Sequence, residues 1–199
     1  MPKISDGIVS SKVFKKEKIK LLWILKEAND KKGKDNWDLR EFLRWIGNEK
    51  KRESCYNKWK ATWGLVCKVS WGILDSTKQY EEINHFDDNM LTQVLYRIAV
   101  INVKKVSGGS SVNQKEFKEY IKDGKYLKEL KKQIKNISPN IIICGNTFHY
   151  MHHPRLSNFN YYKEWCFIEN GIKWINVYHP NQKSNSHKQY FDEAINAIG

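Results

Sequence analysis

Residues 127–147 read LKELKKQIKNISPNIIICGNT, and this stretch decides the expected fold. Apolar residues at 127, 130, 134 and 137 have the spacing of one buried face of a helix. Pro139 ends that helix, because proline cannot continue the hydrogen-bonded ladder. The run NIIICG that follows is apolar at successive positions, which is typical of a strand buried on both faces of a parallel sheet. The stretch therefore predicts a helix that leads into a central strand.

The same alternation of helices and apolar strands extends over the rest of the chain. Further strands are expected at 21–26 and 99–105, with a hairpin around the Asn170-Gly171 turn. One helix is expected to begin after Asp35 or Asn36 as its N-cap, and another after Asp87 or Asp88. A helix is also expected around 59–74, with interruptions at Gly64 and Gly72. The last helix is expected to begin at a capping box formed by Ser186 and Gln189. We therefore predict an α/β fold, a three-layer α/β/α sandwich with a mainly parallel central sheet. It forms a single domain over residues 1–199, with a helical insertion at about 47–90.

The chain carries 35 Lys and Arg against 22 Asp and Glu, a formal net charge of +13 over 199 residues. Such an excess favours a polyanionic partner such as DNA, although a solvated lysine-rich surface is the alternative. No apolar run approaches the ~20 residues of a membrane span, and the first residues lack the apolar core of a signal peptide. We expect a cytoplasmic monomer without a membrane partner.

The cysteine and histidine patterns do not predict a metal site or a cofactor. The four cysteines contain no C-x-x-C pair, so zinc-ribbon and iron–sulfur spacings are missing. Three histidines occur in HYMHHPR (149–155), but adjacent histidines rarely point at one ion, and no nearby carboxylate completes a site.

Three predicted strands end in polar clusters: KEAND (26–30), NVKK (102–105) and YHPN (178–181). In a parallel sheet, ligands bind beyond the carboxyl ends of the strands. If these strands are neighbours, the three clusters converge on one crevice.

These clusters, with the 127–147 stretch between the last two, resemble the uracil-DNA glycosylase superfamily from about residue 20 to 198. In that family a first strand ends in a motif such as G-E-A-P-G, a later strand ends in an asparagine, and the last strand ends in H-P-S. Here Lys26 replaces the first glycine, Asn29 replaces the proline, and Ala28 stands where some branches have a catalytic Asp or Asn. H-P-S has become H-P-N. The resemblance thus implies a divergent member without an iron–sulfur cluster.

A base glycosylase flips its target base, holds it and breaks the N-glycosidic bond. The resemblance implies that a carboxylate supports the sugar cation or orients water, that an asparagine reads the base edge, and that a histidine stabilises the departing base. On this chain the implied catalytic residues are Glu27, Asp30 and His179, and the implied base-binding residues are Asn29, Trp37 and Asn102. Trp37 corresponds to a stacking aromatic and lies outside the apolar stripe of the helix that follows it.

Phosphate contacts are expected from lysines and amides next to these motifs, namely Lys104, Lys105, Asn181 and Lys183. Each catalytic and base-binding assignment has a structural alternative. Glu27 could be a strand-end carboxylate paired with a lysine. Asp30 could be a turn residue or a helix cap, and Asn29 could be a turn residue. Trp37 could pack beneath the insertion, Asn102 could close a loop, and His179 could be a satisfied histidine that holds the Pro180 turn.

The leading hypothesis is a monofunctional DNA glycosylase that acts on uracil or a modified pyrimidine, with water as the final nucleophile. Modified pyrimidines occur in phage DNA, so an antiviral role follows by analogy with the family. The first alternative is a catalytically inactive DNA-binding protein on the same fold, and a second is an RNA-processing α/β hydrolase.

Overall fold

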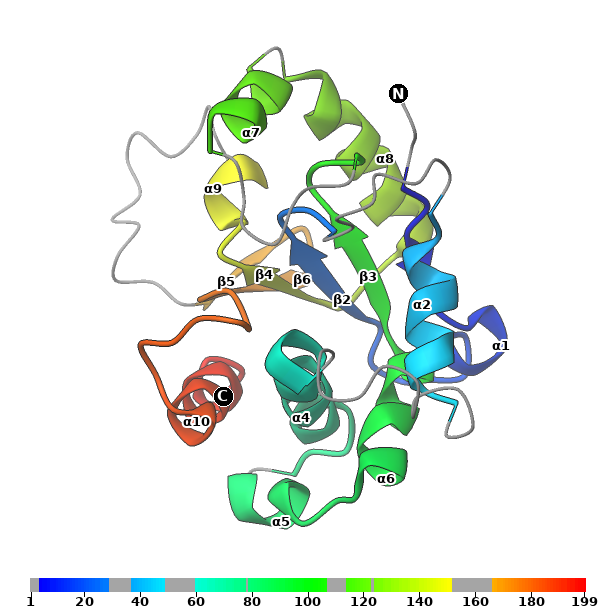
Figure 1. Cartoon of the computed structure of the whole chain (residues 1–199), viewed down its shortest axis with the longest axis vertical. Helices are drawn as coiled ribbons and strands as arrows, with labels where there is room; N and C mark the ends of the chain where they lie inside the picture. The colour runs from blue at the N-terminus through cyan, green and yellow to red at the C-terminus, as the bar shows by residue number, and fades with distance from the viewer. Residues whose placement is uncertain are drawn as a thin grey trace.

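The computed structural model describes residues 4–28, 37–48, 60–77, 79–106, 114–122, 124–151 and 166–199. These residues form a mixed α/β fold around one six-stranded sheet (Figure 1). The strands are β1 (Gly7–Ile8), β2 (Leu21–Leu25), β3 (Ala99–Asn102), β4 (Ile141–Gly145), β5 (Cys166–Glu169) and β6 (Ile172–Val177). They lie in the order β1-β3-β2-β4-β6-β5. The four inner strands are parallel, and β1 and β5 pair antiparallel at the two edges.

Two apolar clusters cover the two faces of the sheet. Along β2, Leu21, Trp23 and Leu25 face one cluster, whereas Leu22 and Ile24 face the other. This alternation follows from the pleat, which points successive side chains to opposite faces. Because both faces are buried, β2 is apolar throughout, as expected for an inner strand of a parallel sheet.

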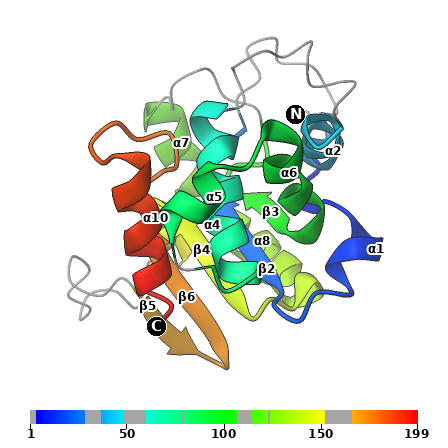
Figure 2. The same ribbon diagram turned by 90° about the horizontal axis from the view of Figure 1, so that it is seen from below.

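Helices form the outer layers (Figures 1 and 2). The helices of the first cluster are α2 (Leu39–Ile46), α4 (Leu65–Leu74), α5 (Tyr80–Asn84), α6 (Asp88–Gln93) with the 3-10 turn η3 (Val94–Arg97), and α10 (His187–Asn196). Those of the second cluster are α1 (Ser11–Phe14), α7 (Gln114–Ile121), α8 (Lys125–Ile137) and α9 (Phe148–Met151). A π-helical turn, η2 (Lys60–Gly64), precedes α4. The prediction of an α/β fold with a mainly parallel sheet is confirmed.

Several local predictions are also confirmed. Helix α8 ends at Ile137, just before Ser138, which has a left-handed backbone, and Pro139. Asn170 and Gly171 both have positive φ, at 53° and 75°, as the tight turn of a hairpin requires. Ser186 and Gln189 form the predicted capping box of α10.

The predicted start of α2 is wrong. Asp38, not Asp35 or Asn36, is the N-cap, and its side chain accepts a hydrogen bond from the backbone N–H of Arg40. The reason is tertiary. Ser5 pairs with this segment, accepting from Leu39 N at 2.8 Å, and it holds Asp38 in an extended conformation that delays the first helical turn.

The region predicted as a helical insertion contributes to the main core. Helix α4 runs through Gly72 without a break, although glycine disfavours helix. A Cβ at Gly72 would approach Ile195 Cδ1 to 2.7 Å, so glycine is what lets α10 pack this closely. Trp23 of the central strand donates to Ser70 Oγ of α4 at 3.0 Å.

No helix in the described ranges is both long and apolar enough to span a bilayer.

Candidate functional site

The carboxyl ends of the four parallel strands lie along one edge of the sheet. Leu25 of β2 is level with Asn102 of β3, and Gly145 of β4 is level with Val177 of β6. The pairing of β2 with β3 continues past both strands, since Lys104 N donates to Lys26 O at 2.8 Å. The three polar clusters of the sequence therefore follow strands that end at the same edge.

Glu27 forms a buried ion pair with Lys104 beyond the ends of β2 and β3. Lys104 Nζ lies 3.0 Å from Glu27 Oε2, and the two side chains are 5% and 4% exposed. The second carboxylate oxygen, Oε1, is buried without a hydrogen-bond partner among the described residues. A buried polar atom without a partner is costly, so one next to strand ends is a candidate for contact with a ligand.

Asn102, the last residue of β3, carries a second atom of this kind. The residue is 1% exposed. Its backbone N–H donates to Asp6 Oδ2 at 2.8 Å, whereas its side-chain Nδ2 is buried without a partner within the described ranges. One acceptor and one donor are thus left unsatisfied at neighbouring strand ends.

His179 follows β6 and is half-buried. Burial, and to a smaller extent the positive charge of Lys26, lower the pKa of His179 from 6.5 to about 4. The imidazole is therefore neutral at physiological pH. Its Nδ1 accepts a hydrogen bond from the backbone N–H of Asn181 at 3.1 Å, which puts the single proton on Nε2. His179 is thus a neutral donor.

The end of β2 and the turn after β6 come together over Gly145. A Cβ there would lie 2.8 Å from Leu25 Cδ2 and 3.2 Å from Pro180 Cδ. The positive charge of Lys26, which follows β2, lowers the pKa of His179, which follows β6, and this effect is consistent with the two strand ends being close. Burial lowers the pKa of Lys26 itself, and Glu27 partly opposes that shift. Charged and polar groups from both strand ends are therefore electrostatically coupled.

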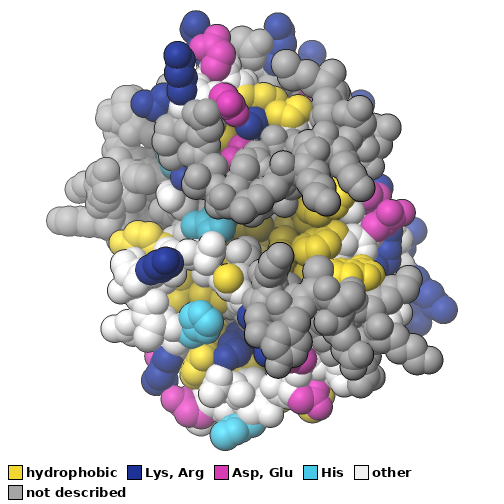
Figure 3. Space-filling view, viewed as in Figure 1, with side chains coloured by type: hydrophobic (Ala, Val, Ile, Leu, Met, Phe, Trp, Pro, Cys, Tyr) yellow, Lys and Arg dark blue, Asp and Glu magenta, His cyan; other side chains and the backbone are white. Residues whose placement is uncertain are grey.

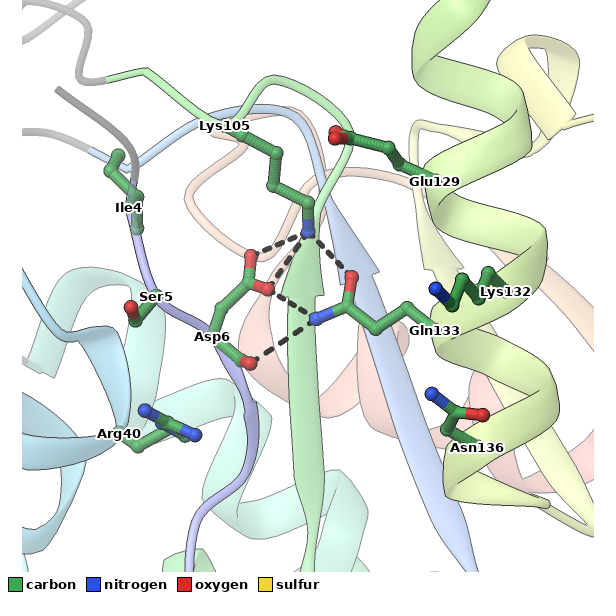
Figure 4. A pocket seen from close by; sticks show the side chains of 9 residues that line it. All are labelled: Ile4, Ser5, Asp6, Arg40, Lys105, Glu129, Lys132, Gln133 and Asn136. Carbon is green, nitrogen blue, oxygen red and sulfur yellow. Dashed lines mark hydrogen bonds and ion pairs between the residues drawn. The ribbon is translucent and has the colours of Figure 1, made fainter. Parts of the chain in front are cut away.

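Sequence reasoning missed Asp6, which anchors the end of β3 (Figure 4). Its carboxylate accepts from Lys105 Nζ at 2.8 Å, from Gln133 Nε2 at 2.6 Å and from the backbone of Asn102. Asp6, Lys105 and Gln133 border a cavity of about 380 Å³ between the N-terminal segment and α8. No local motif marks Asp6, because its partners lie about a hundred residues away along the chain.

Lys104 and Lys105, which are predicted to contact DNA phosphates, are both buried in ion pairs. Their ammonium groups are paired with Glu27 and Asp6, and the residues are 4% and 8% exposed. The reason is that both follow a buried strand whose neighbours supply carboxylates. Asn181 and Lys183 are exposed, before α10.

Trp37 is tied to the N-terminal segment, with its carbonyl accepting from Ser5 N at 3.0 Å. Its half-buried ring lies 5.5 Å from that of Phe42, which stacks on Trp45. These three aromatic residues line a surface hollow of about 620 Å³ beside α2. In the described part of the chain, no hydrogen bond or ring contact joins Trp37 to Glu27, Asn102 or His179. The predicted residues Asn29 and Asp30 lie outside the described residues.

On the face seen in Figure 3, the charged side chains of the described residues do not gather into one patch. Basic side chains lie at several separate places, with acidic ones near them. Among the described residues, no group of three His, Cys, Asp or Glu side chains could hold a metal ion. His152 and His153 lie outside that part of the chain.

Neither a scan against models of known protein families nor a search of curated proteins finds a match to this chain.

Proposed function

We propose that this protein is a DNA N-glycosylase that removes a uracil-type or modified pyrimidine and leaves an abasic site. The observation that supports this most is a pair of buried atoms at adjacent strand ends, Glu27 Oε1 and Asn102 Nδ2, which have no hydrogen-bond partner among the described residues. The edge of a keto-pyrimidine presents a ring N–H and carbonyl oxygens side by side. One of these oxygens can accept from Asn102 Nδ2, while Glu27 Oε1 can accept from the attacking water beside the sugar.

Each of the three groups has a distinct role in this proposal. Asn102 Nδ2 donates to a carbonyl oxygen of the flipped base. Glu27 Oε1 faces the sugar, where a carboxylate stabilises growing positive charge or orients the attacking water. Lys104 holds the other oxygen of Glu27, and this contact fixes the direction of the carboxylate.

His179 stabilises the leaving base. When the glycosidic bond breaks, negative charge grows on the base oxygens, and Nε2–H of a neutral imidazole can donate to one of them. Because the pKa of His179 is lowered to about 4, this donor persists without a net charge over the whole physiological range. A neutral donor of this kind supports charge that appears only in the transition state.

The departures from the family motifs bear on the substrate. Lys26 stands where the motif has glycine, and its charge acts on His179. A lysine side chain at this position changes the charge and the space next to the base, so a pyrimidine other than plain uracil is a serious candidate. Modified bases of phage DNA are therefore included in the test.

The experiment incubates the purified protein with oligonucleotides that contain uracil or other altered pyrimidines, and with phage genomes that carry modified bases. Abasic sites are detected by alkaline strand cleavage. We expect Glu27→Gln and His179→Gln to lose about 100-fold or more of the rate, since each removes a group that acts in the transition state. DNA affinity should change little.

Matched controls are Glu81→Gln and His187→Gln, which alter a carboxylate and an imidazole on exposed positions of α5 and α10. Both should cleave at the wild-type rate. If the protein binds DNA but makes no abasic site from any substrate, the glycosylase proposal is rejected. That result would favour the binding protein on the same fold, for which the buried Glu27–Lys104 pair is a structural contact. Competition between RNA and DNA tests the RNA-processing alternative.

A further inference from the structure

We infer that Asp6 is a positioning residue, whose buried carboxylate holds the end of β3 so that the side-chain amide of Asn102 faces the base. This inference rests on the proposed function through the role of Asn102. Asp6 does not touch the substrate in this scheme, and it acts through the backbone of the residue that does.

The contacts of Asp6 are those of an anchor. Its side chain is 1% exposed. Oδ2 accepts from Asn102 N at 2.8 Å and from Lys105 Nζ at 2.8 Å, and Oδ1 accepts from Lys105 Nζ at 2.8 Å and from Gln133 Nε2 at 2.6 Å. In Figure 4 the carboxylate points between Lys105 and Gln133, from the N-terminal segment toward α8. A single side chain therefore joins the N-terminal segment, β3 and α8.

The Asp6 carboxylate takes the place of a backbone hydrogen-bond acceptor that β1 does not supply to β3. Strand β1 has only two residues, and its pairing with β3 reaches no further than Gly7 opposite Val100. On the other side Asn102 is level with Leu25 of β2. The backbone N–H of Asn102 would have no strand partner on the β1 side, and Asp6 supplies the acceptor. Because Asn102 is the last residue of its strand, this bond restrains the backbone from which its amide projects.

The N-terminal segment also links the two predicted base-binding regions. Ile4 N donates to Lys105 O at 2.7 Å, and Ser5 N donates to Trp37 O at 3.0 Å. Between them, the segment contacts the chain after β3 and the chain before α2. Displacing Asp6 should therefore loosen Asn102 first. Errors of about 1 Å in the position of a substrate-binding group can cost up to 100-fold in rate.

Only a carboxylate meets all the donors that converge here. Its two oxygens accept from three different groups, and it balances the buried charge of Lys105. Asp6→Asn has nearly the same shape but turns an NH2 group toward these donors. It is therefore the variant that tests the contact while it keeps the packing.

The first readout is a double-mutant cycle in the excision assay. Asp6→Asn is expected to lower kcat/KM about 10- to 100-fold, and Asp6→Asn in an Asn102→Ala background is expected to add little. Glu17→Gln is the matched control, because it weakens another ion pair, with Arg97, away from the site. The inference would be overturned if the double variant lost kcat/KM by the product of the two single effects. It would also be overturned if Asp6→Asn lowered kcat/KM no more than Glu17→Gln does.

The second readout is backbone amide exchange, which does not depend on activity. The Asn102 amide should exchange at least 10-fold faster in Asp6→Asn, while Ile143 in β4 stays protected. Gln133→Leu is the milder variant if Asp6→Asn folds poorly, and the same amide should respond. Unchanged Asn102 exchange in the variants overturns the anchoring role. Absence of turnover in the wild-type protein would instead reject the proposed function, while the exchange result still decides whether Asp6 holds Asn102.

Discussion

His179 provides a prediction that does not depend on any substrate. Its pKa is lowered from 6.5 to about 4, mainly by burial and further by Lys26. In the unfolded chain the imidazole should titrate near 6.5. Between about pH 6.5 and pH 4 the unfolded state binds a proton at His179 that the folded state does not bind. The free energy of unfolding therefore falls as the pH drops through this range. A depression of this size corresponds to about 3 kcal/mol once the pH reaches the folded-state value.

The assay has two parts. An NMR titration of the imidazole protons should give a midpoint near pH 4 for His179 in the wild-type protein. Urea unfolding at pH 7 and near pH 4 should show that the wild-type protein loses about 3 kcal/mol more than His179→Gln, which has no imidazole to protonate.

Lys26→Met is the control for the cause of the shift. It removes the smaller contribution, so the pKa of His179 should rise but stay below 6.5. A wild-type midpoint near 6.5, or equal acid losses in the wild-type protein and His179→Gln, would refute the reasoning.

Three further substitutions test packing and pairing through urea unfolding. Lys104→Met should lower the free energy of unfolding by about 3 to 5 kcal/mol, because it leaves Glu27 buried and unpaired. Adding Glu27→Leu should recover most of this loss. Equal stability of the single and double variants would contradict the pairing of Glu27 with Lys104. Gly145→Ala should cost about 1 to 3 kcal/mol, since the new Cβ would meet Leu25 Cδ2 at 2.8 Å, and a neutral effect would mean that the strand ends are not in close contact. Ser186→Ala should cost about 1 kcal/mol by removing the cap of α10, whereas Ser186→Asp should cost much less.

The candidate site was predictable only in part. The motifs located Glu27, Asn102 and His179 at strand ends, and the structure puts those strand ends along one edge of the sheet. They did not reveal that Lys104 pairs with Glu27 or that Lys105 pairs with Asp6. A lysine after a strand has the same local appearance whether it faces solvent or a buried carboxylate.

The sequence by itself determined the helices, the apolar strands and the polar residues that follow them, because side-chain periodicity and turn residues act over a few positions. Helix α8, the strand after Pro139 and the turn at Asn170-Gly171 all follow from such local patterns. Only the tertiary structure decided the strand order, the later start of α2 at Leu39 and the anchoring of Asn102 by Asp6. The physical reason is that burial and pairing energies depend on which segments become neighbours in space, and residues 6 and 102 acquire a shared environment only when the sheet has formed.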